Sequence, residues 1–263
     1  MLAKVVGEIH NYVVGFLRVE DTPHGSKAVL LGSGTLVRVL DKFAILTADH
    51  VLDGLPKKTG RVGLILEKTR QTFTVDARGI EYIRIARGTV AAEGPDLGAI
   101  MLSAPIASSI RSIKSFYNLN SRREQTLAGP PDATVGVWAA NGFIDEWTME
   151  SVPHPGEERI VRFYNFTGYG QPQDRRVVGE HDYYSYPVSG GGRAIAPEYF
   201  NGVSGGGLWH VALGAEKDGT FVHRSLLLAG VVFYQVPTTD TECGLTCHGP
   251  MSVYRVAFDA ISG

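Results

Sequence analysis

Three stretches of the chain carry side chains that together could perform acyl transfer. The stretch FNGVSGGGLW, residues 200–209, places Ser204 among four glycines. A serine nucleophile needs an unhindered hydroxyl with backbone N–H donors close to it, and glycine permits the backbone angles and close approach that such a turn requires. Gly202 and Ser204, separated by one residue, can supply two such amides. For this stretch alone, the alternative is a glycine-rich turn that leads into a strand.

The other two stretches supply a base and a carboxylate. His50 lies in FAILTADHVLDG, residues 43–54, directly after an apolar run typical of a buried strand. Such a histidine is held in place and can still point into a cleft, as a general base requires. Asp96 precedes the apolar run LGAIML, where its carboxylate can accept a hydrogen bond from an imidazole N–H and fix the tautomer. Taken singly, a structural histidine and a turn-forming aspartate are the simpler interpretations.

The elements that must position these residues are short strands. Apolar residues recur mostly at strand spacing, in runs bounded by Gly, Pro, Asn and Asp. Residues 103–131 lack this alternation and are interpreted as a connector between two series of strands. The first series is predicted at 12–19, 29–39, 43–47, 62–66, 73–75, 82–85 and 97–102. The second is predicted at 134–139, 160–164, 181–186, 207–212, 226–234 and 251–255, with a short terminal helix at 256–262. Many short strands with frequent turn signals favour a β-sandwich or a β-barrel.

Bulk composition disfavours several classes of function. Hydrophobic residues make up 44% and charged residues 20% of the 263 residues, as is typical of a globular protein. The formal net charge of −2 gives no electrostatic reason to expect a nucleic acid or an anionic membrane as partner. The N-terminal region contains no uninterrupted apolar segment of the kind found in signal peptides, so we expect no signal peptide. The longest apolar run, 226–236, is too short to span a bilayer. We therefore expect a cytoplasmic protein that binds neither nucleic acid nor membrane.

Cys243 and Cys247 lie in TECGLTCHGP, whose composition predicts a loop. Free thiols in a reducing compartment are the expectation, with a local disulfide or metal binding together with His248 as alternatives. The spacing is one residue too long for a C-x-x-C-H haem site. Two cysteines and one histidine are one ligand short of a tetrahedral zinc site. We predict no metal and no organic cofactor.

Taken in the order His50, Asp96, Ser204, the three stretches resemble the chymotrypsin-like (trypsin-like) serine peptidase family, in particular its bacterial members. The resemblance rests on LTADHV, PDLGAIML and GVSGGGLW. In addition, GSGTLV is similar to the family's strand before the histidine, LLAGVVFYQ to the strand that lines the primary specificity pocket, and VYRVAFDAI to the final strand and terminal helix. The similarity extends from about residue 12 to the C-terminus.

The resemblance implies an all-β fold of two six-stranded antiparallel β-barrels with a short C-terminal helix. His50 and Asp96 would lie in an N-terminal barrel, 1–115, and Ser204 in a C-terminal barrel, 131–263, with a connector at 116–130. The cleft would lie between the two barrels.

The resemblance also implies a serine endopeptidase that acts on a protein or peptide substrate. Ser204 would attack the scissile carbonyl, His50 would take and return the proton, and Asp96 would orient His50. The amides of Gly202 and Ser204 would form the oxyanion hole. The substrate pocket is assigned to three residues: Glu198, Tyr234 and Gln235. Glu198 stands where an acidic residue would select basic side chains, but a surface glutamate is the alternative, so primary specificity is left open.

Two positions depart from the family pattern. Val203 stands where zymogen-activated members have an aspartate that pairs with a newly cut N-terminal amine. A valine cannot accept that ammonium, so N-terminal zymogen cleavage is excluded as the activation route, and the loop is either pre-formed or ordered by substrate or an activating protein partner. Phe233 and Tyr234 stand where the family usually has a serine and an aromatic residue, and that serine supports the aspartate; a one-residue shift in the alignment is the alternative explanation. The alternative function is therefore a catalytically silent binding or scaffold protein of the same fold.

Overall fold

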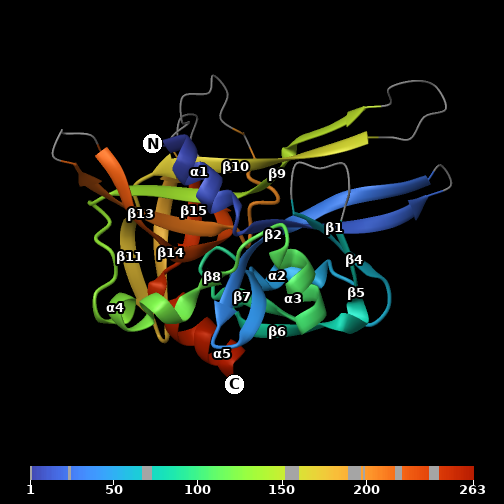
Figure 1. The fold of residues 1–263 in the computed structure, drawn as a ribbon, viewed down its shortest axis with the longest axis horizontal. Helices are drawn as coiled ribbons and strands as arrows, with labels where there is room; N and C mark the ends of the chain where they lie inside the picture. The colour runs from blue at the N-terminus through green and yellow to red at the C-terminus, as the bar shows by residue number, and fades with distance from the viewer. Residues whose placement is uncertain are drawn as a thin grey trace.

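The computed structural model describes residues 2–22, 25–66, 73–151, 160–188, 197, 199–216, 221–236 and 243–263. Within these ranges the chain forms two β-sheets, one from each half of the sequence (Figure 1). The strand pairs are antiparallel, apart from one short parallel pair in the first sheet. The prediction of an all-β fold with two series of strands is confirmed at this level.

The first sheet has the strand order β5-β4-β1-β2-β3-β7-β6, and β8 pairs with β2. Its strands are β1 (Val13–Thr22), β2 (Gly25–Val39), β3 (Lys42–Thr47), β4 (Arg61–Ile65), β5 (Phe73–Asp76), β6 (Ile80–Arg87), β7 (Asp96–Leu102) and β8 (Tyr117–Asn118). The sequence KFAILT of β3 is rich in the apolar residues that pack well on a pleated surface. Helix α2 (Asp49–Asp53) follows β3, and helix α3 (Ala104–Arg111) follows β7.

The second sheet has the order β10-β9-β13-β14-β15-β12-β11. Its strands are β9 (Val137–Ser151), β10 (Ile160–Gly170), β11 (Gln173–Val178), β12 (His181–Val188), β13 (Gly207–Ala215), β14 (Phe221–Val236) and β15 (Cys243–His248). Helix α4 (Arg123–Ala128) lies in the segment between the sheets, and helix α1 (Leu2–His10) opens the chain. Helix α5 (Phe258–Ser262) is the short C-terminal helix that the sequence predicts.

Two sequence predictions are wrong and several elements were missed. Residues 251–255, predicted as a strand, are helical, and Ser252–Ala257 is a π-helical segment that continues into α5. Residues 243–248, predicted as a loop, form β15, because β12 and β14 pair with this segment on its two sides. Long-range pairing here overrides the turn-like composition. The helices α1, α3 and α4, the strands β8 and β11, and the short 3-10 helical segments Ala77–Gly79 and Leu119–Arg122 had no prediction, and β9 begins later and runs further than expected.

The hydrophobic core joins the two sheets. One cluster contains Val37 and Leu46 of the first sheet together with Trp209 and Leu228 of the second. Both terminal helices contribute to the same cluster, through residues such as Ile9 of α1 and Ile261 of α5. The chain therefore packs its two halves against each other along a buried apolar interface, and the ends of β3, β7 and the turn before β13 meet beside it.

Candidate active site

His50 and Asp96 are brought together by the pairing of β3 with β7. Thr47 of β3 lies opposite Gly98 of β7 in the antiparallel register, so the residues just beyond Thr47 face the start of β7. His50 Nδ1 lies 2.6 Å from Asp96 Oδ2, and the backbone N–H of His50 donates to Asp96 Oδ1 at 3.0 Å. Both carboxylate oxygens thus hold the same residue in place.

The two side chains differ in exposure. The side chain of Asp96 is 10% exposed and that of His50 is 42% exposed. Burial acts to raise the pKa of Asp96, but the hydrogen bonds and charge of His50 outweigh it, so the pKa lies below its ordinary value. An ionised Asp96 accepts from Nδ1–H, which leaves Nε2 of His50 as the proton acceptor.

His248 on β15 is a further residue of this site, and the sequence analysis assigned it no role here. The backbone N–H of Asp96 donates to His248 Nε2 at 3.1 Å. His248 is fully buried, and its ring lies 4.7 Å from the ring of Phe233. Burial, followed by the charge of His181, lowers the pKa of His248 to about 3, so the ring is neutral with its proton on Nδ1. The family pattern would place a serine at position 233 to support Asp96, but this chain has Phe233 there. His248 of the neighbouring strand β15 instead accepts a hydrogen bond from the backbone N–H of Asp96.

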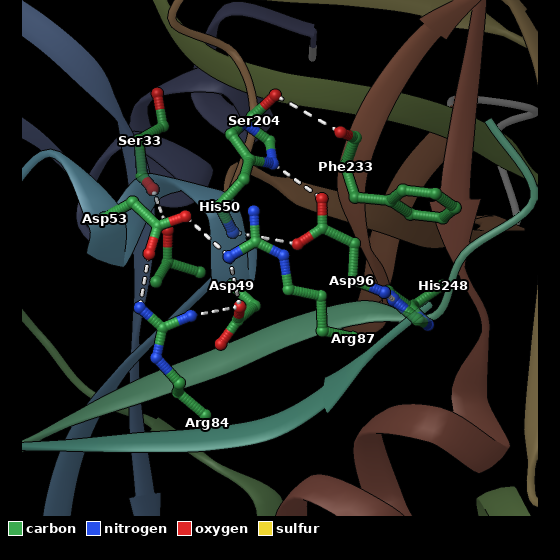
Figure 2. A network of polar contacts seen from close by, with 11 residues as sticks. Ser33, Asp49, His50, Asp53, Arg84, Arg87, Asp96, Ser204, Phe233 and His248 are labelled. Carbon is green, nitrogen blue, oxygen red and sulfur yellow. Dashed lines mark hydrogen bonds and ion pairs between the residues drawn. The ribbon is translucent and has the colours of Figure 1, made fainter. Parts of the chain in front are cut away.

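Helix α2, which carries His50, is held in place by ion pairs between two of its aspartates and two arginines of β6 (Figure 2). Arg84 Nη1 and Arg87 Nη1 donate to Asp49 Oδ2 at 2.7 and 3.2 Å, and both arginines also bind Asp53. These hydrogen bonds lower the pKa of Asp53 to about 2. Because Asp49 and Asp53 are the two ends of α2, β6 fixes the helix in position and with it His50.

The turn before β13 requires glycine at Gly202. Gly202 has φ of +94°, a region that L side chains rarely adopt. A Cβ at this position would lie 2.6 Å from Leu30 Cδ2 and 2.9 Å from the carbonyl oxygen of Phe143. The turn is tied to β14, because Gly205 N–H donates to the carbonyl of Val232 at 2.7 Å.

Ser204 lies within this turn and is partly exposed. Its Oγ donates to the carbonyl of Phe233 at 3.4 Å and is not hydrogen-bonded to His50 in this structure. In the view of Figure 2 the His50 ring lies between Ser204 and Asp96. Rotation about the Cα–Cβ bond of Ser204 is the motion available for redirecting the hydroxyl.

Two backbone amides of this turn are unpaired within the described residues. Neither Gly202 N–H nor Ser204 N–H donates a hydrogen bond there. The intervening Val203 is fully buried, in a core cluster with Phe200 and Val232. Val203 therefore holds the turn by apolar packing at the position where an aspartate was the family expectation.

A cleft of about 770 Å³ contains the predicted residues. His50, Asp96 and Ser204 line it together with Gly202, and so do Tyr234 and Gln235, which the sequence assigned to the substrate pocket. Gln235 Oε1 accepts a hydrogen bond from Phe200 N–H at 2.8 Å, which ties β14 to the turn. Glu198, the third residue assigned to that pocket, lies outside the described residues.

Cys247 and His248 of TECGLTCHGP lie in β15 with buried side chains. Cys247 is a buried free thiol, and burial raises its pKa. Cys243 and Cys247 lie four residues apart in one strand, which separates their Cα atoms by about 13 Å at about 3.3 Å per residue. A disulfide needs a Cα separation below about 7 Å, so the local disulfide is excluded. Among the described residues no group of three or more His, Cys, Asp or Glu side chains could hold a metal ion.

Comparison with known proteins assigns no family to this chain. No protein-family model matches the sequence, and no curated protein matches it at a significant level. In the part of the chain that the structure describes, no helix is long and apolar enough to cross a membrane. The candidate active site therefore stands on its residues and their geometry.

Proposed function

We propose that the protein is a serine endopeptidase with a chymotrypsin-like arrangement of two β-barrels and a catalytic triad of Ser204, His50 and Asp96. The observation that carries the proposal is the convergence of these three distant residues on one cleft, with His50 Nδ1 held 2.6 Å from Asp96 Oδ2. The two mostly antiparallel sheets, one from each half of the chain, support the architecture.

In the proposed reaction the hydroxyl of Ser204 turns from the Phe233 carbonyl toward His50 Nε2 and attacks the scissile carbonyl. His50 takes the hydroxyl proton, and the ionised Asp96 stabilises the imidazolium that forms. The N–H groups of Gly202 and Ser204 donate to the oxyanion of the tetrahedral intermediate.

The intermediate collapses when His50 gives its proton to the leaving amine, which breaks the peptide bond and leaves an acyl ester on Ser204. Water then attacks the ester, His50 removes a proton from that water, and Ser204 leaves with the proton from His50. The proposed substrate is a protein or peptide whose chain lies in the cleft beside Tyr234 and Gln235.

A catalytically silent scaffold is the second candidate. It is favoured by the hydrogen bond of Ser204 Oγ to the Phe233 carbonyl, since in this arrangement the hydroxyl is not engaged by the base. In a scaffold this bond would persist with peptide bound, and Ser204 would react with no acylating or phosphonylating reagent. In a peptidase, substrate binding at the Phe233 carbonyl would release the hydroxyl.

The proposal is tested by profiling the cleavage of a proteome-derived peptide library with the wild-type protein and with Ser204→Ala. Loss of the nucleophile should lower kcat by about 10⁶-fold and leave the fold intact, because the triad acts as a unit. Circular dichroism and the thermal midpoint check the fold. Cleavage by Ser204→Ala at the wild-type rate would rule out the proposed mechanism.

A further inference from the structure

Ser33 on β2 is a fully buried serine that contacts residues 202–204, here called the oxyanion turn, at two points. Its Oγ donates to the carbonyl of Gly202 at 2.6 Å, and its backbone N–H donates to the carbonyl of Ser204 at 2.8 Å. The same Oγ accepts a hydrogen bond from Phe143 N–H of β9 at 2.8 Å. One hydroxyl therefore bridges the first sheet, the second sheet and the turn between Gly202 and Ser204.

The Ser33 hydroxyl fixes one peptide plane of the turn. Because a trans peptide is planar, its carbonyl and N–H point in opposite directions. The carbonyl of the Gly202–Val203 peptide is bound by Ser33, and its N–H donates to the carbonyl of Phe200 at 3.0 Å. This peptide is held on both sides, so it cannot rotate without losing two buried hydrogen bonds.

The two peptides that carry the unpaired amides are also held by their carbonyls. The carbonyl of Asn201 accepts from Asp145 N–H at 2.9 Å, which directs Gly202 N–H to the opposite side. The carbonyl of Val203 accepts from Gly206 N–H at 2.8 Å, which likewise directs Ser204 N–H. The orientation of both amides thus follows from contacts that are present without a ligand.

Packing around Ser33 leaves little room for another arrangement. A Cβ on Gly142 of β9 would lie 2.9 Å from Ser33 Oγ and 3.1 Å from Val203 Cα. The backbone of β9 therefore packs directly against the serine and the turn. A flipped turn would leave the Ser33 hydroxyl buried without an acceptor, which is costly.

From these contacts we propose that Ser33 is a positioning residue that keeps the oxyanion turn formed in the free protein. The inference rests on the proposed peptidase function and deepens it: the enzyme is active as the intact chain, without proteolytic cleavage and without an activating partner. Ser33 and the buried Val203 together replace the aspartate–ammonium pair that a zymogen-activated enzyme would use.

Thr35 offers a matched control on the same strand. It is also buried, and its Oγ1 donates to the carbonyl of Gly205 at 3.3 Å, just outside the oxyanion turn. Thr35→Val removes a buried hydroxyl as Ser33→Ala does, but leaves the contacts of Gly202 in place. Both variants should lower the thermal midpoint, and only one of them should change the chemistry.

The first measurement uses the intact wild-type protein and a fluorophosphonate probe, with and without cell extract. The inference predicts the same labelling rate at Ser204 in both conditions. Labelling that requires extract or chain cleavage would overturn the inference and leave the proposed function standing. If Ser204 stays unlabelled under every condition, the proposed function fails and the inference fails with it.

The second measurement compares the variants in peptide hydrolysis and in binding of a peptidyl boronic acid, a transition-state analogue. Ser33→Ala should lower kcat about 10²-fold with little change in KM, and weaken boronic acid binding to a similar degree, since oxyanion donors act in the transition state. Thr35→Val should keep the wild-type kcat. Equal kcat values for Ser33→Ala and Thr35→Val would overturn the role of Ser33. Should Ser33→Ala fail to fold, the labelling rate of the wild-type protein still decides whether the turn is pre-formed.

Discussion

At the residue scale, Asp96 offers its two carboxylate oxygens to one partner, the imidazole ring and backbone of His50. This double contact fixes both the position and the tautomer of the ring. Asp96→Asn keeps the shape of the side chain but replaces the acceptor with an amide that can favour the wrong tautomer. We expect kcat to fall by about 10⁴, the size of effect known for this change in trypsin-type enzymes.

Steady-state kinetics and the thermal midpoint check the effect of Asp96→Asn. Because Asn keeps the shape of the side chain, we expect a large fall in kcat and only a small change in the thermal midpoint. Unchanged kcat in a folded Asp96→Asn protein would show that the carboxylate plays no part in the reaction.

Gly202 is the residue whose replacement should damage the oxyanion turn most directly. Gly202→Ala introduces a Cβ against Leu30 and the Phe143 carbonyl and forces an alanine to φ of +94°. We expect a loss of about 1–3 kcal/mol of stability, as for other strained backbone conformations, together with a large fall in kcat. Gly129→Ala is the control, because a Cβ there meets no atom within 4 Å. Urea unfolding measures the stability of both variants, and peptide hydrolysis measures their kcat. Equal stability and equal kcat in Gly202→Ala and Gly129→Ala would contradict this account.

Much of the candidate site could be predicted from sequence, because its residues stand in locally recognisable settings. His50 follows an apolar strand, Asp96 precedes one, and Ser204 lies among glycines. His248 could not be predicted, since its contact with Asp96 depends on β15 pairing beside β14, which has no local signal. Ser33 was missed for the same reason: its partners lie more than a hundred residues away in the chain.

At the element scale, prediction succeeded where a strand has its own apolar pattern and failed where pairing decides the structure. β3 and β7 carry such patterns and were predicted within one residue of their ends. β15 contains glycine, threonine and cysteine, and it is a strand because two neighbours supply its hydrogen-bond partners. The π-helical segment Ser252–Ala257 contains valine and tyrosine, which favour strands, but it buries Val253, Tyr254 and Ala257 against the core instead.

The buried imidazole on β15 gives the protein a predictable acid sensitivity. The pKa of His248 is lowered to about 3 in the folded protein, whereas an unfolded histidine has a pKa of about 6.5. Below pH of about 6.5 the unfolded chain therefore binds a proton that the folded chain does not, and stability falls as pH drops from about 6.5 toward 3. His248→Gln keeps an acceptor for Asp96 N–H and removes this titration.

Urea unfolding at pH 7 and pH 4.5 measures the contribution of His248. At about 1.4 kcal/mol per pH unit, the wild-type protein should lose roughly 2 to 3 kcal/mol more than His248→Gln between these two pH values. His210, whose pKa is also lowered by burial, titrates in both proteins and cancels in the comparison. Equal losses in the two proteins would contradict the burial of a neutral His248.

At the scale of the whole molecule, the terminal helices join the two halves of the chain. Ile9 of α1 and Ile261 of α5 belong to one core cluster with Trp209 of the second sheet and Leu46 of the first. Lys42 Nζ also donates to the carbonyl of Ser262 at 2.9 Å, which ties α5 to β3. We infer that the two halves unfold together, since neither buries its share of this cluster alone.

Ile261→Ala tests this cooperativity. The cavity should cost about 2–5 kcal/mol, and the three tryptophans, all in the second half of the chain, should report the same shifted urea midpoint as far-UV circular dichroism. Separate midpoints for tryptophan fluorescence and circular dichroism would mean that the halves unfold independently.

The central claim is that Ser204 is an activated nucleophile in the intact protein, and covalent labelling tests it most directly. The wild-type protein is incubated with a fluorophosphonate, and the modified residue is identified by peptide mass spectrometry, with Ser204→Ala and His50→Ala as controls. We predict one phosphonyl group per chain on Ser204 and none in either variant. Wild-type protein without an adduct at Ser204, or with the same labelling as His50→Ala, would contradict the claim.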